Sequence, residues 1–404
     1  MSKVLSLLIL FIMTCPNFSF AKKEEFSLTQ YLKLVEAQNL NFKIEKAEVD
    51  VAEARSRGAR IPPPMIGYMQ MKEGNRINQG YEVSQEIPFP TKISKDHEVR
   101  KLEMESQKET SRIQTKSILI EARSAYLDFW ASFSKLEIQK EKLTWLKEHV
   151  KIAQSLSWPD TSAKAHLLEV ELDRDLLENE ILAIESEVEA SRSLLRNFTP
   201  ELNVNDITPV EPLALSLKIG KNTPHSPVLL KEKELAVSRA KEDLQKKSYL
   251  PDFSLRFRSY DRNEMSPQSQ EMMVGISLPF VFFWQPKAET TEASAQRLKA
   301  EVELQKAKVE SETKVLSLVK RIEINQAQLK NLKENVIPRA ERRMKLIRNL
   351  SKRTMEGLDQ HKSVMLALLD LKIKAIDLRL EFEKNFAELL KLSGEGSSAE
   401  GAFK

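Results

Sequence analysis

The stretch that decides the fold runs from Pro251 to Phe280 and reads "PDFSLRFRSYDRNEMSPQSQEMMVGISLPF". Apolar and polar residues alternate in it one for one, first after Pro251 and again before Phe280, with a polar turn between. A period of two is the pattern of a β-strand that has one apolar and one polar face. The stretch therefore predicts a hairpin with two unlike faces. Phe253, Leu255, Phe257, Val274 and Ile276 fall on the apolar face, and Arg256 and Arg258 fall on the polar one.

The rest of the chain has the composition of long helices. Only 10 of its 404 residues are Gly, and 30% are Asp, Glu, Lys or Arg. Proline is absent from four long stretches, which predicts four long helices, and apolar residues recur in them at alternating spacings of three and four, as in a coiled coil. The net charge is only +4 and the two signs are interleaved, which gives no support to nucleic-acid binding.

The first residues have the features of an export signal. Lys3 precedes the apolar run "VLSLLILFIM", and Ser19 and Ala21 are small residues at the positions that a signal peptidase reads. We expect residues 1–21 to be removed and Lys22 to begin the mature chain. Cys15 is the only cysteine, which excludes an intrachain disulfide. Its setting "IMTC" is loosely like a lipoprotein cleavage box, so lipidation of Cys15 and its removal with the signal peptide are both open.

The chain reads as a tandem duplication. The segment "FKIEKAEVDVAEARSRGARIPPPMIGYMQMK" has a counterpart in "VLLKEKELAVSRAKEDLQKKSYLPDFSLRFR", and "VSQEIPF" from Val83 matches "VGISLPF" from Val274. Each half predicts a helix, a hairpin and two long helices. We expect a first repeat at 22–198, a proline-marked linker at 199–227, a second repeat at 228–393 and a flexible tail at 394–404.

The two hairpins together predict four strands. In the first hairpin, Tyr81 and Val83 alternate with Glu82, Ser84 and Glu86. One apolar and one charged face is typical of a membrane barrel, with apolar residues toward lipid and polar residues toward the lumen. No later segment has the roughly 20 apolar residues of a membrane helix, so any spanning part would be made of strands. Four strands cannot close alone, so several chains would have to share one barrel. The alternative is a small sheet packed on its own helices with its polar face in water.

The ordered set of these motifs resembles the TolC-like outer-membrane efflux proteins over essentially the whole mature chain. The resemblance rests on "SLTQYLKLVEAQN", on the helix end from Ala47 to Pro64, on the corners "QEIPFP" and "GISLPF", and on "TSAKAHLLEVELDRDLLENEILAIESEVEASRSLLRNF". This last stretch and "QEIPFPTK" are most similar to the branch that serves heavy-metal pumps.

The resemblance implies a mainly α-helical fold with a small β part. It implies a homotrimer in the outer membrane whose long antiparallel coiled-coil helices form an α-barrel in the periplasm and whose strands form a shared twelve-stranded barrel. Transport would be passive, through a periplasmic adaptor protein and an inner-membrane pump of the RND type, with heavy-metal ions as one candidate cargo. Lipid would contact Tyr81, Val83, Phe253, Leu255, Phe257, Val274 and Ile276, and the lumen would be lined by Glu82, Ser84, Glu86, Arg256 and Arg258.

The resemblance also places adaptor docking and pore constriction at the two periplasmic helix tips. The first tip would comprise Trp158, Pro159 and Asp160, where Trp158-Pro159 replaces the expected glycine, and the second tip would comprise Gly357 and Leu358. The family's acidic ring positions hold Ser363 and Leu366 here. The nearest carboxylates, which are candidates for a constriction or simply solvated helix charges, are Glu356, Asp359 and Asp370.

The sequence has no pattern of an enzyme or a cofactor site. The five histidines share no ligand spacing, so we expect no metal site, and no nucleophile elbow or phosphate loop is present. The competing hypothesis is an exported periplasmic coiled-coil scaffold without a channel. No residue pattern specifies the cargo, the pump or the residues that close the pore.

Overall fold

The computed structural model describes residues 24–73, 76–156, 161–203, 207–212, 225–260, 269–282, 284–347 and 355–393. The expected signal peptide at 1–21, the expected tail at 394–404 and the first-tip residues Trp158, Pro159 and Asp160 lie outside them. The chain forms two compact units. One comprises Met1–Asn39, Ala122–Leu215 and Leu329–Leu380, and the other comprises Leu40–Glu121, Ser216–Gln328 and Glu381–Lys404.

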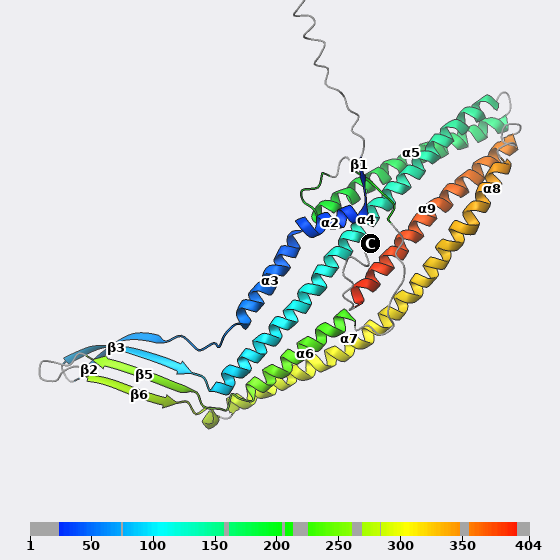
Figure 1. Ribbon diagram of the computed structural model, residues 1–404. Helices are drawn as coiled ribbons and strands as arrows, with labels where there is room; N and C mark the ends of the chain where they lie inside the picture. Colours follow the sequence, from blue (N-terminus) through cyan, green and yellow to red (C-terminus); the bar gives the residue numbers. More distant parts are fainter. Residues whose placement is uncertain are drawn as a thin grey trace, which may run out of the picture. The chain divides into compact units, whose positions relative to one another are not determined.

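Both halves of the chain place their elements in the same order (Figure 1). The first half holds α3(Leu40–Ser56), β2(Met65–Glu73), β3(Arg76–Ile87), α4(Pro90–Leu156) and α5(Thr161–Leu194). The second holds α6(Ser226–Gln245), β5(Phe253–Tyr260), β6(Ser269–Ile276), α7(Trp284–Asn331), α8(Ile337–Ile347) and α9(Met355–Leu392). The π-helical turn η3(Leu332–Val336) joins α7 to α8. The predicted mainly helical fold with a small β part is confirmed.

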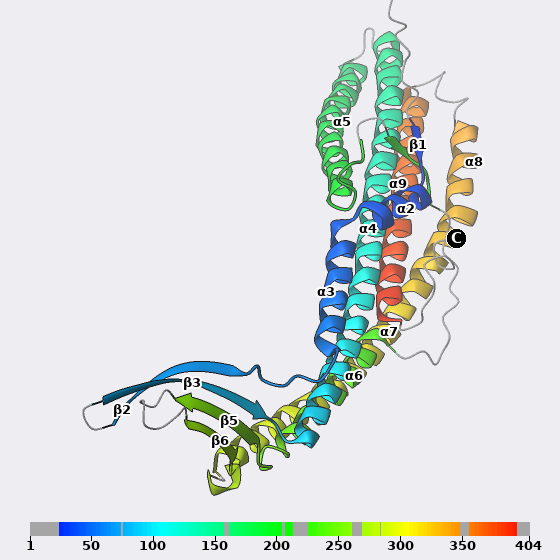
Figure 2. The same cartoon turned by 60° about the vertical axis from the view of Figure 1, so that its left-hand side comes forward.

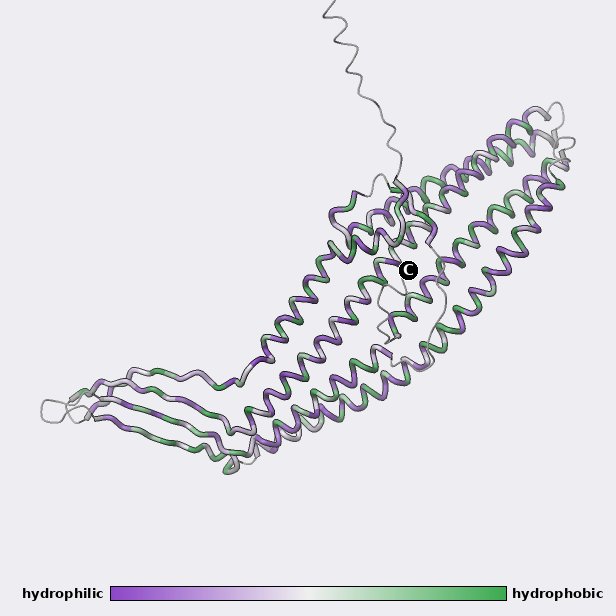
Figure 3. The backbone as a smooth tube through the Cα atoms, in the orientation of Figure 1, coloured by the Kyte–Doolittle hydropathy of each residue, from purple (hydrophilic) through white to green (hydrophobic). Residues whose placement is uncertain are grey.

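The two hairpins form one antiparallel sheet in the order β2-β3-β5-β6. In the register, Val83 lies opposite Phe257, and Phe257 lies opposite Met272 on β6. Glu82 lies opposite Arg258, which lies opposite Glu271. Because directly opposed residues in an antiparallel pair point to the same side, the register gathers apolar side chains on one face and charged ones on the other. Figure 3 shows the resulting alternation of hydropathy along the strands.

In the unit that contains this sheet, ion pairs fix the order of four helices. Lys108 on α4 pairs with Glu53 on α3, and Lys241 on α6 pairs with Glu103 on α4. Between α6 and α7, Lys231 pairs with Glu303 at 3.0 Å. The helices therefore lie side by side in the order α3-α4-α6-α7 (Figure 1). This order matches the strand order β2-β3-β5-β6, because each helix is joined to one of these strands. The helices α3 and α7 are thus at the two flanks.

The end of α3 is set by Arg100. Its guanidinium donates to the carbonyl oxygens of Arg55 at 2.9 Å and Gly58 at 3.1 Å, the type of partner that helix-terminal carbonyls need. Gly58 has φ +69°, in the left-handed region that glycine adopts without steric cost. Arg100 and Gly58 together end α3 and turn the chain toward β2.

The other unit is built on aromatic and leucine packing. It also contains β1(Glu24–Phe26), α2(Leu28–Gln38) and β4(Ile207–Pro209), and β1 pairs with β4 in parallel. Tyr31 and Tyr126 are fully buried and stack with ring centroids 5.9 Å apart. The Tyr126 hydroxyl donates to the carbonyl of Phe26 at 2.6 Å and accepts from the Val210 amide at 3.0 Å. A buried tyrosine thus ties α4 to both short strands.

The long helices of the same unit form a layer. Lys147 on α4 pairs with Glu178 on α5, and Lys135 on α4 pairs with Asp377 on α9. The order is therefore α5-α4-α9, and Figures 1 and 2 both show α8 beside α9 on the side away from α4. In this unit, α5 and α8 are the flanking helices of the layer.

Candidate functional sites

The polar face of the sheet centres on Glu82. One carboxylate oxygen lies 2.7 Å from Nε of Arg258 and the other lies 3.1 Å from Nε of Arg256, so a single acid holds two arginines. Ser84 lies opposite Arg256 in the register, and Glu86 lies opposite Ser254. All five residues expected to line a lumen therefore share one face of the sheet.

The apolar face of the sheet is exposed in the single chain. Tyr81 is 64% exposed and Val274 66%, and the large side chains of Val83, Leu255, Phe257 and Ile276 are also exposed. Phe253 is half-buried because its ring stacks on Phe89, with centroids 6.2 Å apart. A contiguous apolar surface of this kind is unusual on a monomeric soluble protein and marks a surface that lipid or protein covers.

The two outer strands of the sheet each have one neighbour. Within the described strands, β2 pairs only with β3, and β6 pairs only with β5. Their outward backbone N–H and C=O groups are a template for pairing with another chain. The sheet therefore has the geometry of an open segment rather than of a closed barrel.

The second predicted tip lies at the start of α9. Gly357 and Leu358 are buried in its first turns, and Glu356 is exposed. Asp359 is exposed as well, and its Oδ1 lies 3.9 Å from Nδ1 of His166 on α5. Asp370 lies further along α9, 3.6 Å from the Lys142 ammonium. Two of the three candidate constriction acids thus have basic neighbours within their own chain.

Near this tip, three histidines from three helices meet around Trp145. The rings of His149 on α4 and His361 on α9 lie 5.0 Å and 5.2 Å from the Trp145 ring. His166 on α5 contacts His149 edge-on at 6.0 Å. Nε2 of His149 and Nε2 of His166 are buried without a hydrogen-bond partner among the described residues. Burial is the main cause that lowers the pKa of His149, the nearby His166, Lys362 and His361 add to it, and together they bring the pKa to about 4.

Lys362 lies beside this cluster. Its side chain is 8% exposed, and its ammonium donates to Glu169 at 2.7 Å and to Asp173 at 2.8 Å, both on α5. This group and the histidine cluster could not be predicted from the sequence, because their members come from separate helices with no fixed spacing. Over the described residues, no group of His, Cys, Asp and Glu is arranged to hold a metal ion.

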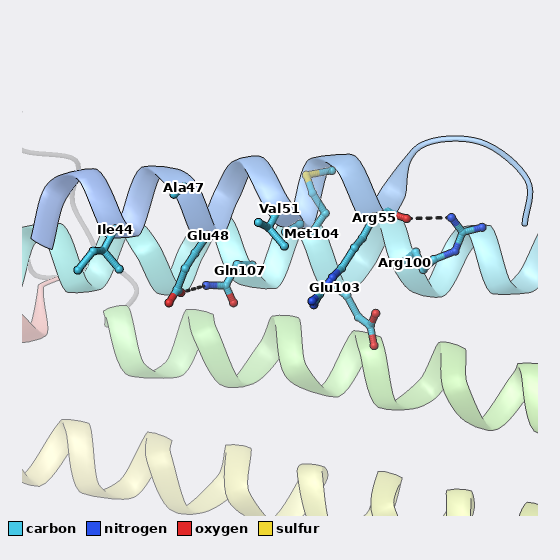
Figure 4. A pocket seen from close by; sticks show the side chains of 10 residues that line it. Ile44, Ala47, Glu48, Val51, Arg55, Arg100, Glu103, Met104 and Gln107 are labelled. Carbon is cyan, nitrogen blue, oxygen red and sulfur yellow. Dashed lines mark hydrogen bonds between the residues drawn. The ribbon is translucent and has the colours of Figure 1, made fainter.

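A shallow groove runs between α3 and α4 (Figure 4). Exposed Ile44 and Val51 line it on the α3 side, and Met104 lines it on α4. Gln107 on α4 donates to Glu48 on α3 at 2.8 Å across the groove. The groove lies on one flank of the helix layer and is lined by both apolar and charged side chains.

Comparison with known proteins shows similarity in structure and not in sequence. No protein-family model matches the chain, and no curated protein matches it. Among the described helices, none is both long enough and apolar enough to cross a membrane.

Several solved structures match along most of their length. The outer membrane channel MtrE of Neisseria gonorrhoeae, in its open state, matches with a TM-score of 0.75 at 11% identity, over 90% of this chain and 88% of that one. The Campylobacter jejuni outer membrane channel CmeC matches with a TM-score of 0.73 at 11% identity, over 93% and 88%. CusC, whose structures concern transmembrane channel formation, matches with a TM-score of 0.72 at 12% identity, over 91% and 92%. The chain therefore has the fold of these outer-membrane channels, the fold that its resemblance to the TolC-like proteins predicts.

Proposed function

We propose that this protein is the outer-membrane channel of a tripartite efflux system and not an enzyme. The observation that carries the proposal is the register of the sheet, which separates an exposed apolar face from a face on which Glu82 holds Arg256 and Arg258. Lipid outside and water inside are the two surroundings that such faces require. The likeness to outer-membrane channels over about nine tenths of the chain supports the same assignment.

The functional form is a homotrimer. The unpaired edges of β2 and β6 would pair between copies, so three four-stranded sheets would close a twelve-stranded barrel in which no backbone group is left unpaired in lipid. The flanks of the helix layers also expose apolar side chains. On α3 these include Ile44 and Val51, and on α7 they include Val302, Val309 and Leu316 at intervals of seven. Side-by-side packing of α3 on α7 of the next copy would bury both rows.

In this assignment the helices would form a passage through the periplasm, and the tips would meet a periplasmic adaptor. An inner-membrane pump, of the RND type that the resemblance implies, supplies energy and selects the cargo. The channel conducts passively what the pump delivers, and heavy-metal ions are one cargo class that the resemblance brings into the proposal.

The test is conductance in a planar bilayer after detergent extraction from the outer-membrane fraction. We expect steady single-channel conductance from the wild-type protein. Leu255→Asp combined with Ile276→Asp would place two carboxylates per chain on the lipid face, where charge is costly, and should abolish insertion. Ser84→Asp and Ser254→Asp on the opposite face are the matched control and should still insert and form channels, because charge on that face would lie in water.

Two results would overturn the proposal. One is a mature protein that is soluble, monomeric and without conductance, which would favour the periplasmic scaffold. The other is a Leu255→Asp, Ile276→Asp protein that conducts like the wild type, which would remove the sheet from the pore wall.

A further inference from the structure

The two flanking helices of the α5-α4-α9-α8 layer carry opposite charge. α8 contains four basic residues, Arg339, Arg342, Arg343 and Lys345, and one acidic residue, Glu341. α5 contains nine Asp and Glu residues and only three Lys and Arg residues. The arginines of α8 are exposed and have no ion-pair partner in the described part of the chain, although most lysines of α4 and α9 in this unit pair with acids. The positive charge of these arginines is therefore not neutralised by an ion pair within the described part of the chain.

Each flank also exposes leucine on the same face as its charges. On α8, Arg339, Arg342, Arg343 and Leu346 follow the spacing of one helix face, and Leu346 is 76% exposed. On α5, the corresponding face carries leucines and acids in alternation. It comprises Leu168, Glu171, Leu172, Asp175 and Leu176. The α8 face thus has one exposed leucine beside positive charges, and the α5 face has three exposed leucines beside negative charges.

The two faces lie at the same height in the layer. The helices α8 and α9 are antiparallel, so residues at equal distances from the end of α8 and from the start of α9 lie at the same height. Ala340 is the eighth residue from the end of α8 and Lys362 is the eighth residue of α9, so these two residues are level. Lys362 in turn pairs with Glu169 and Asp173 on α5. Arg339 to Arg343 are therefore level with the acidic and leucine-bearing part of α5. Rotation about an axis along the helices keeps this height, so the match would hold between copies.

We propose that α8 of one copy docks on α5 of the next copy, with Arg342 and Arg343 facing Glu171, Arg339 facing Asp175, and Leu346 packing on Leu168. The proposal rests on the trimeric channel proposed above and identifies the contact that closes the ring of helices near the tips. Asp175 already has Arg174 at 2.6 Å, and its remaining carboxylate oxygen is available to a second cation. Burial of the exposed leucines would stabilise the contact. The opposite charges would determine that α8 pairs with α5 and would set the register between the two helices.

The test is disulfide trapping between two differently tagged copies expressed together, one with Leu346→Cys and the other with Leu168→Cys. Cys15 is the only natural cysteine and lies in the expected signal peptide, so the engineered cysteines report alone. We expect a mixed-tag dimer on a non-reducing gel. Leu182→Cys is the matched control for Leu168→Cys, because Leu182 is also exposed but lies about 21 Å further along α5. It should give little product with Leu346→Cys.

Charge reversal supplies the second measurement. Arg342→Glu should lower the yield of the mixed dimer severalfold, and Glu171→Arg in the partner copy should restore it. Lys151→Glu, at an exposed position on α4, should leave the yield unchanged. A conducting trimer without the Leu346–Leu168 cross-link, or with an Arg342→Glu yield equal to that of the wild type, would overturn this contact and leave the proposed channel standing. If Arg342→Glu abolished transport while the yield of the mixed dimer stayed at the wild-type level, Arg342 would act through another contact and the proposed charge pairing would be wrong.

Discussion

Asp252 and Lys92 join the two repeats at the corner between sheet and helix. The Lys92 ammonium lies 2.9 Å and 2.8 Å from the two carboxylate oxygens of Asp252, and the same carboxylate accepts the Phe89 amide at 2.9 Å. Asp252 also exchanges two hydrogen bonds with Ser277, at the end of the second hairpin. Asp252, which directly precedes β5, thus binds both the start of α4 and Ser277, which directly follows β6. Both hairpins are therefore held at one corner.

We expect Asp252→Asn to destabilise this corner by about 1–3 kcal/mol, because it removes a charge-assisted pair from a lysine that is largely buried. The measurement is urea unfolding of the purified protein in detergent. Asp243→Asn is the control, since Asp243 on α6 is exposed and lies 3.6 Å from Lys246, the residue that follows the helix. Equal unfolding midpoints for the two variants would contradict the role of Asp252.

Replacing Glu82 should change ion selectivity if the polar face lines a pore. Glu82→Gln leaves Arg256 and Arg258 without their shared carboxylate, so the face gains positive charge in every copy. The reversal potential in a salt gradient should then shift toward anion selectivity. Glu187→Gln, at an exposed position on α5, is the control and should leave the potential unchanged. An unshifted potential in Glu82→Gln would place the cluster outside the conduction path.

The hairpins could be predicted from the sequence because a period of two is a local signal, and strict alternation at Phe253, Leu255 and Phe257 specifies both strand and face. The register across β3 and β5 could not, because Glu82 and Arg258 are far apart in the chain and their pairing follows from the closure of the whole sheet. For the same reason, the histidine cluster around Trp145 could not be predicted from the sequence. Its histidines have no common spacing, and only the packing of α4, α5 and α9 brings His149, His166 and His361 together.

Lys362 should be the lysine of α9 whose loss most affects the tip. Lys362→Met leaves Glu169 and Asp173 near each other without their shared cation, and breaking such a partly buried pair costs on the order of 3 kcal/mol. We expect faster cleavage near the start of α9 in limited proteolysis. Lys372→Met is the matched control, because its ammonium is more exposed and lies 3.7 Å from Glu141. Similar cleavage rates in both variants would show that the Lys362 pair does not hold α5 to α9.

The stability of the helix tip should fall in mild acid because of His149. Its pKa is lowered from 6.5 to about 4 in the folded chain, so the unfolded chain binds the proton more tightly. The stabilisation is complete above pH 6.5 and is lost as pH falls toward 4, by at most about 3 kcal/mol. Thermal unfolding between pH 7.5 and 4.5 measures this loss. His149→Gln should flatten the dependence on pH over that window, whereas His97→Gln, at an exposed position on α4, should retain it. An equal slope in His149→Gln and the wild type would assign the acid sensitivity to other groups.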